Sequence, residues 1–189
     1  MTRPSTPSGS SSKILTIPNL LSALRLCMIP VFAWLYCAKD DPFGAGIVLA
    51  ASGITDMLDG FIARTFHMVS DVGKVLDPIA DKLTQAVMLV CLLTRFPLMI
   101  IPFVLLICKE LFMGITGLLV IRKTGAVFGA DWHGKVNTVL LYAVMILHLF
   151  WPDLPAGVSG GLIGACVVMM LVSMALYGLH HIRVLKGKR

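Results

Sequence analysis

The sequence predicts an all-α, polytopic membrane protein, and its composition and apolar patterning carry this prediction. Of the 189 residues, 57% are hydrophobic and only 14% are charged, and the mean hydropathy is +0.88. Soluble domains average about 25% charged residues. Six largely apolar stretches of helical length follow one another between short polar segments. This pattern is typical of a membrane-embedded helical bundle.

The first residues of the chain differ from the rest. Residues 1–12 are polar and rich in Ser and Pro, so we expect a disordered tail. They lack the continuous apolar core of a signal peptide, and the mature chain is expected to start here. Residues 13–189 are expected to form one membrane domain. Pro18 and Asn19 interrupt its first apolar pattern, which predicts a short interfacial helix before the first span.

The first three spans are expected at residues 20–38, 43–64 and 73–94. The first span is apolar apart from Arg25 and small polar residues. The charged turn Lys39-Asp40-Asp41-Pro42 separates it from the second. A short connection, residues 65–72, leads to the third.

The last three spans are expected at residues 98–121, 136–150 and 158–179. The turn Arg95-Phe96-Pro97 precedes the fourth span, which carries Lys109 and Glu110 near its middle. A polar loop leads from the fourth span to the fifth, and a turn rich in Pro precedes the sixth.

Basic residues predict the orientation of these six spans, because cytoplasmic segments of membrane proteins carry an excess of Lys and Arg. Six spans place both termini and the second and fourth connections on one side. That side collects Arg3, Lys13, Arg64, Lys74, Arg122, Lys123, Lys135, Arg183, Lys186, Lys188 and Arg189. The opposite side has only Lys39 and Arg95. We therefore expect a multi-pass protein of the bacterial cell membrane with both termini cytoplasmic. The net charge of +6 then reflects topology, and no nucleic-acid partner is expected.

Four aspartates lie where the second span ends and the third begins. Asp56 and Asp59 are three residues apart, and Asp77 and Asp81 are four apart, so each pair shares one helix face. Ionisable side chains in apolar surroundings are costly and are by default functional. Two facing helices would bring the four carboxylates together. Their repulsion is relieved by hard divalent cations such as Mg²⁺ or Mn²⁺.

The aspartates belong to a longer pattern, D-x2-D-G-x2-A-R-x8-G-x3-D-x3-D, which runs from Asp56 to Asp81. All eight specified positions agree with the pattern of the CDP-alcohol phosphatidyltransferase family, and a chance match at one given start is on the order of one in 10⁹. The resemblance extends from Ile17-Pro18-Asn19-Leu20-Leu21 and Arg25 to Gly134-Lys135. It implies a six-helix membrane enzyme, usually a homodimer, with a dinuclear metal site on the cytoplasmic side. Members displace CMP from a CDP-linked donor with the hydroxyl of an alcohol.

The resemblance assigns roles to the residues of this pattern. It implies two divalent ions, Mg²⁺ or Mn²⁺, held by Asp56, Asp59, Asp77 and Asp81. Asp81 would share metal coordination with general-base catalysis on the acceptor hydroxyl. The implied contacts with the CDP-linked donor are Asp56, Gly60, Ala63, Arg64 and Gly73. Taken alone, the small residues would also suit close helix packing, and Arg64 would suit a topology charge.

The alcohol acceptor is expected to contact basic residues outside this pattern. Candidates that could grip an acceptor phosphate are Lys109, Arg122, Lys123 and Lys135, with Arg25 a further one. Residues 109–138 resemble the bacterial phosphatidylglycerophosphate synthases of this family, which use glycerol 3-phosphate. Those synthases usually carry Arg where this chain has Lys109 and Leu119.

The predicted donor is CDP-diacylglycerol and the predicted acceptor glycerol 3-phosphate. Lys135-Val136-Asn137-Thr138 also resembles the cardiolipin synthases of the CDP-alcohol type. The alternative acceptor is therefore phosphatidylglycerol.

Two further expectations follow from the residues. Lys109 and Glu110 point about 100° apart on a helix, so they are not expected to pair with each other. Each needs a polar neighbour, for which the metal cavity is the obvious candidate. A carboxylate-rich site between helices would also suit a cation transporter. Against this function, the aspartates lie at span ends and not at the midplane.

Overall fold

The computed structural model describes residues 17–65, 73–124 and 132–185. This part of the chain is helical apart from short turns and contains no strand. The α-helices are α1 (Ile17–Cys37), α2 (Pro42–Thr65), α3 (Gly73–Leu92), α4 (Ile100–Thr124), α5 (Trp132–Phe150) and α6 (Ala156–Leu185). A single 3₁₀ turn, η1 (Pro97–Met99), precedes α4. The predicted all-α fold is confirmed.

The helix ends lie close to the predicted span ends, with two larger differences. Helix α5 begins at Trp132, four residues before the predicted span, and α6 continues to Leu185, six residues beyond it. Hydropathy marks only the apolar part of a helix, and both extensions carry polar side chains. At the N-terminus, α1 runs through Pro18 and Asn19 without a break. Proline is tolerated there because the first N–H groups of a helix have no partner within it. The rest of the expected interfacial helix, residues 13–16, and the tail lie outside the described residues.

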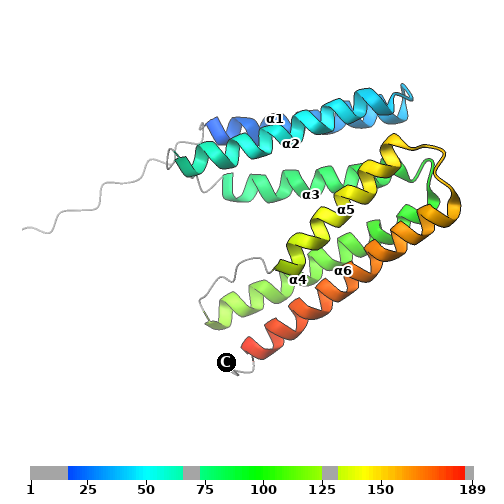
Figure 1. The fold of residues 1–189 in the computed structure, drawn as a ribbon. Coiled ribbons are helices and arrows are strands. Elements are labelled where there is room, and N and C mark those ends of the chain that lie inside the picture. The colour runs from blue at the N-terminus through cyan, green and yellow to red at the C-terminus, as the bar shows by residue number, and fades with distance from the viewer. Residues whose placement is uncertain (1–16, 66–72, 125–131, 186–189) are drawn as a thin grey trace, which may run out of the picture.

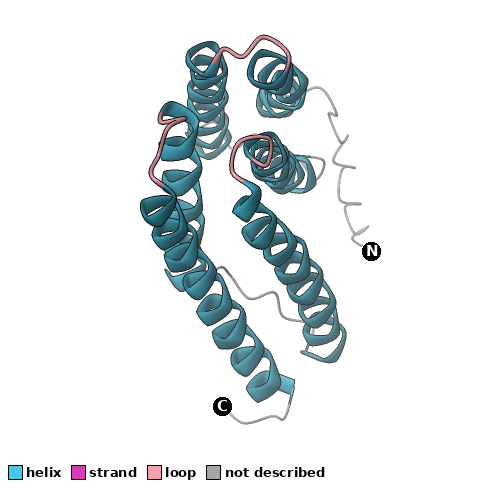
Figure 2. Ribbon diagram, turned by 90° about the vertical axis from the view of Figure 1, so that its right-hand side faces the viewer, coloured by secondary structure: helices cyan, strands magenta, loops and turns pink. Residues whose placement is uncertain are grey.

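The six helices alternate in direction. Helices α1 and α2 lie side by side, α4 and α6 form a second pair, and α3 and α5 lie between the pairs (Figure 1). The turns that join α1 to α2, α3 to α4 and α5 to α6 gather at one end of the bundle (Figure 2). The opposite end therefore holds the last turns of α2 and the first turns of α3, where the aspartates lie.

The bundle has the composition of a membrane protein. Among the residues that the structure describes, four stretches are long and apolar enough to cross a bilayer: Leu20–Cys37, Pro97–Lys123, Trp132–Phe150 and Ala156–Val184. Helix α3 falls short because Asp77, Asp81 and Lys82 interrupt its apolar surface. Large apolar side chains such as Phe43 and Val168 are exposed, as expected for surfaces that face lipid. The fold is that of a polytopic membrane protein, and the count of six spans stays a prediction.

The packed core lies away from the aspartates. It centres on Met88, Leu89 and Leu92 of α3, which are completely buried against Met145 and Leu149 of α5. Along α3 these residues come after the charged first turns, and along α5 they come after the polar start of the helix. All five therefore lie nearer the end of the bundle where the connecting turns gather. Tight packing therefore fixes α3 against α5 beyond the aspartates.

Candidate active site

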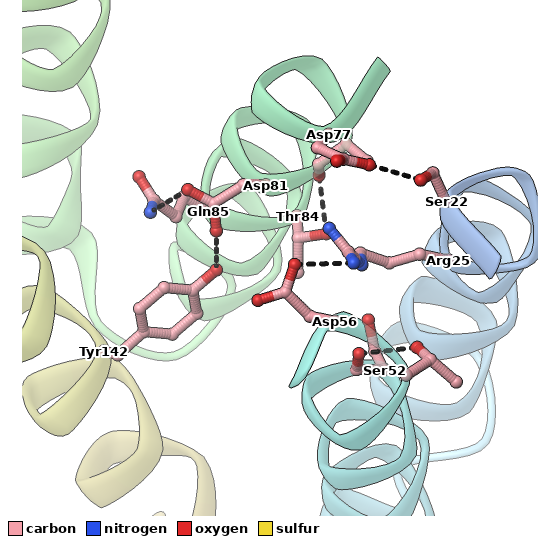
Figure 3. Close-up of polar contacts among 11 residues, drawn as sticks. Ser22, Arg25, Ser52, Asp56, Asp77, Asp81, Thr84, Gln85 and Tyr142 are labelled. Atoms are coloured by element: carbon pink, nitrogen blue, oxygen red, sulfur yellow. Dashed lines mark hydrogen bonds and ion pairs between the residues drawn. The ribbon is translucent and has the colours of Figure 1, made fainter. Parts of the chain in front are cut away.

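Three of the four predicted aspartates have described side chains, and they point to different neighbours (Figure 3). Asp56 extends from α2 towards α1, and Asp77 and Asp81 come from the first turns of α3. Asp77 accepts a hydrogen bond from the hydroxyl of Ser22 on α1. Asp81, one turn further along, points instead to α5. Although Asp77 and Asp81 lie on one face of α3, they contact two different helices, α1 and α5.

The cation that compensates Asp56 comes from the first span. Arg25 Nη2 lies 2.6 Å from Asp56 Oδ1, and the Arg25 side chain is only 3% exposed. A buried guanidinium in an apolar helix requires a counter-charge. Arg25 was expected as a contact for acceptor phosphate, and the structure places it on a motif carboxylate. Its position as the one charge inside the first span was the signal that it has a partner in the site.

Asp81 is held by hydrogen bonds on both of its oxygens. Tyr142 of α5 donates its hydroxyl to Oδ1 at 2.8 Å, and Gln85 donates Nε2 to Oδ2 at 3.2 Å (Figure 3). Sequence reasoning missed both residues. Gln85 lies four residues after Asp81 on the same helix face, which is a readable signal. Tyr142 is 61 residues away in the sequence, and only the packing of α5 on α3 brings it here.

The aspartates have the right chemistry for a hard divalent cation, because Mg²⁺ and Mn²⁺ prefer oxygen ligands. In the part of the chain that the structure describes, no three His, Cys, Asp or Glu side chains lie close enough together to hold a metal ion. The expected convergence of the carboxylates is thus not seen for Asp56, Asp77 and Asp81. Asp56 instead pairs with Arg25 of α1, and Asp77 accepts a hydrogen bond from Ser22 of the same helix. The side chain of Asp59 lies outside the described residues.

A first cavity of about 480 Å³ opens beside this cluster. Asp56 and Asp81 both line it, with Arg25 and Tyr142 next to them. We call it the apolar cavity, because the rest of its wall is apolar apart from two hydroxyl side chains. Those remaining wall residues are Gly46, Leu49, Ala50, Ser52, Gly53, Thr84, Ile146 and Phe150.

A second cavity, of about 450 Å³, lies among α3, α4, α5 and α6. We call it the basic cavity, because three lysines line it: Lys82, Lys109 and Lys135. The ammonium of Lys82 lies 2.9 Å from a Glu110 carboxylate oxygen, and that of Lys109 lies 3.7 Å from the same oxygen. Lys109 and Glu110 do meet, so the expectation that they would not pair was wrong. Long side chains can bend towards a common neighbour even when their Cβ atoms diverge.

The basic cavity separates the predicted acceptor residues into two groups. Lys109 and Lys135 line it. Arg122 and Lys123 are exposed in the last turn of α4 and are not among the residues that line it. Lys82 was missed by sequence reasoning, although it directly follows Asp81. Adjacent residues of a helix point about 100° apart, so Asp81 faces the apolar cavity and Lys82 faces the basic cavity.

The predicted donor contacts can be located only on the backbone. Gly60, Ala63 and Arg64 lie on the last turns of α2, and Gly73 is the first residue of α3. Their surroundings lie outside the described residues. The bounds of α2 and α3 nevertheless place all four at the carboxylate end of the bundle.

Residues 15–177 match the family described as CDP-alcohol phosphatidyltransferase. This match covers most of the chain, and the protein therefore belongs to that family.

Relatives of the chain include phosphatidyltransferases that are named for glycerol 3-phosphate and cardiolipin synthases. The CDP-diacylglycerol–glycerol-3-phosphate 3-phosphatidyltransferase of Bacillus subtilis is 31% identical over 150 residues, which cover 70% of this chain and 77% of that protein. The protein of the same name from Escherichia coli K12 is 27% identical over 172 residues, covering 85% and 92%. A cardiolipin synthase (CMP-forming) of Streptomyces coelicolor is 44% identical over 80 residues, covering 39% of this chain. The chain spans 36% of the length of that last relative.

Proposed function

We propose that this protein transfers a phosphatidyl group from CDP-diacylglycerol to glycerol 3-phosphate, giving phosphatidylglycerophosphate and CMP. The observation that carries the proposal is that Asp56 of α2 and Asp81 of α3, both from the family pattern, line one cavity. The two relatives that align over 150 and 172 residues are named for this activity, and both alignments are longer than that of the cardiolipin synthase.

The chemistry is one displacement at phosphorus. The acceptor hydroxyl oxygen forms a bond to the phosphatidyl phosphorus, and the bond from that phosphorus to the oxygen of CMP breaks. Asp81 accepts the hydroxyl proton, and CMP leaves with the electron pair. Tyr142 and Gln85 hold the Asp81 carboxylate in place for this step. A positioned base of this kind contributes about 10²–10⁴-fold to a rate.

We propose that Asp56, Asp59, Asp77 and Asp81 hold the divalent ions, Mg²⁺ or Mn²⁺, that the reaction needs. When bound, such ions neutralise charge on the pyrophosphate and on the departing CMP. Arg25 lies beside Asp56 and supplies a fixed positive charge at the same place. We propose that Gly60, Ala63 and Gly73 bind the donor by letting the nucleotide come close to the backbone. Arg64 is proposed to contact a donor phosphate.

The basic cavity is the proposed place for the phosphate of the acceptor. Lys82, Lys109 and Lys135 offer three ammonium groups against one carboxylate, Glu110, an excess of positive charge that suits a phosphate dianion. Lys109 is almost fully buried, at 4% exposure, where an anionic partner offsets the cost of burying its charge. Lys82 directly follows Asp81, which puts the proposed phosphate site and the proposed base on neighbouring faces of α3.

Phosphatidylglycerol is the second candidate acceptor, because the cardiolipin synthase relative shares the highest identity of the three, over a shorter stretch. The test is to incubate purified protein and CDP-diacylglycerol with Mg²⁺ or Mn²⁺ and either acceptor, and to follow CMP release and the lipid product. The proposal expects CMP and phosphatidylglycerophosphate with glycerol 3-phosphate. Product with phosphatidylglycerol alone would identify a cardiolipin synthase. No CMP release with either acceptor would refute both functions.

We further propose that the protein works as a homodimer in the cell membrane, with the carboxylate end and both termini on the cytoplasmic side. The basic residues Arg122, Lys123 and Arg183 lie at that end of α4 and α6, as expected for cytoplasmic segments. Cysteine labelling from outside intact cells tests the orientation. In a background whose native cysteines, including the exposed Cys37, are replaced by serine, a cysteine introduced at Asp153, in the turn after α5, should react, and one at Lys123 should not.

A further inference from the structure

The apolar cavity extends far beyond the carboxylates. On α2 its wall follows one helix face through Gly53, Ala50 and Gly46, which are small, and on α5 it follows Ile146 and Phe150. The charged and phenolic groups all lie at one end. A water-soluble nucleotide or a sugar phosphate has no use for such a wall, whereas a hydrocarbon chain does.

The cavity is long enough to take a hydrocarbon chain. Asp56 and Gly46 are ten residues apart on α2, and a helix rises about 1.5 Å per residue, so the wall is about 15 Å long. This length is half of the hydrocarbon core of a bilayer, which is about 30 Å thick. Gly46 lies in the first turns of α2 and Phe150 is the last residue of α5, so the cavity leads from the carboxylates towards the opposite end of the bundle.

Phe150 closes the far end. A Cβ atom built on Gly46 would lie 2.3 Å from Cζ of the Phe150 ring, so this contact exists only because residue 46 has no side chain. The ring lines the cavity at this point, while 51% of the side chain stays exposed. The small residue on α2 and the large residue on α5 together set the depth of the cavity.

We propose that the apolar cavity binds one acyl chain of the lipid donor, and that Phe150 against Gly46 sets the chain length that fits. This inference rests on the proposed function, because it assumes a lipid donor whose phosphates reach Asp56 and Asp81. Continuity with the carboxylates selects this occupant: a chain in the cavity has its head group at the reacting end. Lipid tails are as apolar as the cavity wall, so selection comes from shape and not from hydrophobic gain.

The first test shortens the cavity at mid-depth. Ala50 lies six residues from Asp56, about 9 Å along the helix, and Ala50→Phe fills the slot there. With dipalmitoyl CDP-diacylglycerol, we expect kcat/KM to fall at least about tenfold, as overpacking of a fitted site would cause. With dioctanoyl donor, whose chains are half as long, the loss should stay within about twofold. The matched control is Ala165→Phe, at an exposed alanine of α6 that does not line either cavity.

The second test lengthens the cavity. Phe150→Ala removes the ring at the far end and should shift the preferred donor to longer chains, measured as kcat/KM over dioctanoyl, dilauroyl, dipalmitoyl and distearoyl donors. Phe43→Ala, at an exposed phenylalanine outside the cavity, should leave the profile unchanged. A second readout is the chain length of lipid that copurifies with each variant, which does not depend on turnover.

Several outcomes would overturn the acyl-chain site. An unchanged chain-length profile in both Ala50→Phe and Phe150→Ala would do so, as would equal losses for long and short donors in Ala50→Phe. A response to the chain length of a phosphatidylglycerol acceptor, at constant donor, would assign the cavity to the acceptor instead. Failure of the proposed function looks different, because wild-type protein would then release no CMP with any donor.

Discussion

The hydroxyl of Tyr142 donates a 2.8 Å hydrogen bond to Oδ1 of Asp81, and this contact joins α5 to the proposed catalytic base on α3. Gln85 binds the second oxygen from one turn further along α3. Because each oxygen accepts a hydrogen bond from a different residue, the carboxylate is held in one orientation. A base held in this way needs no reorientation when the acceptor hydroxyl arrives.

The Tyr142 contact can be tested by removing one oxygen atom. In Tyr142→Phe the ring stays and Asp81 loses a donor, so we expect kcat to fall about tenfold, the effect of one hydrogen bond to a charged group. The KM for the CDP-linked donor should stay within about twofold, because Tyr142 acts on the base and not on the nucleotide. Steady-state kinetics of CMP release measures both. Tyr36→Phe, at a buried tyrosine of α1 outside both cavities, is the control. Loss of donor affinity at constant kcat would contradict a positioning role.

The Arg25–Asp56 pair should contribute to stability. Arg25→Gln leaves Asp56 without its cation, and we expect the free energy of unfolding to fall by about 2 kcal/mol, between the values for exposed and buried pairs. Asp56 is 57% exposed, which places the effect below that of a fully buried pair. Thermal unfolding in detergent measures the change.

A double-mutant cycle separates the pair from its surroundings. Asp56→Asn in the Arg25→Gln background should recover part of the loss, because the uncompensated carboxylate is gone. The control is Arg95→Gln, which breaks an ion pair with the exposed Asp40 and should cost less than about 1 kcal/mol. Additive effects of the two substitutions at the site would show that Arg25 and Asp56 do not interact.

Lysines that line the basic cavity should affect acceptor binding, whereas lysines outside it should not. Lys135→Ala should raise the KM for glycerol 3-phosphate about tenfold, since a charge-assisted phosphate contact is lost. Its effect on the KM for CDP-diacylglycerol should be small. Lys123→Ala, which removes an exposed lysine of α4 outside the cavity, should change neither value. Equal effects of the two variants would mean that general positive charge, and not the cavity, attracts the acceptor.

Metal dependence gives a prediction for the whole carboxylate group. Dialysis against EDTA should abolish CMP release, and Mg²⁺ or Mn²⁺ should restore it, because two divalent ions neutralise the charge that develops on CMP. Asp59→Ala should abolish turnover even in excess metal, although the protein should still fold. Circular dichroism and gel filtration in detergent check the folding. Near-normal activity of this variant would refute the assignment of Asp59 as a metal ligand.

The sequence by itself determined the helices and the family. Apolar stretches of helical length end at charged or proline-containing turns, so the ends of α1 to α4 could be predicted to within a few residues. Hydropathy is a local property, and it needs no knowledge of neighbouring helices. The spacing from Asp56 to Asp81 is local as well, which is why the aspartate pattern could be read without a structure.

Only the tertiary structure decided which side chains meet. Arg25 lies 31 residues before Asp56, and Tyr142 lies 61 residues after Asp81, and no periodicity links residues so far apart. The division of Asp81 and Lys82 between two cavities likewise depends on how α5 crosses α3. Side-chain packing between helices sets that crossing. The aspartates were therefore predictable as a group, whereas the partner of each one was not.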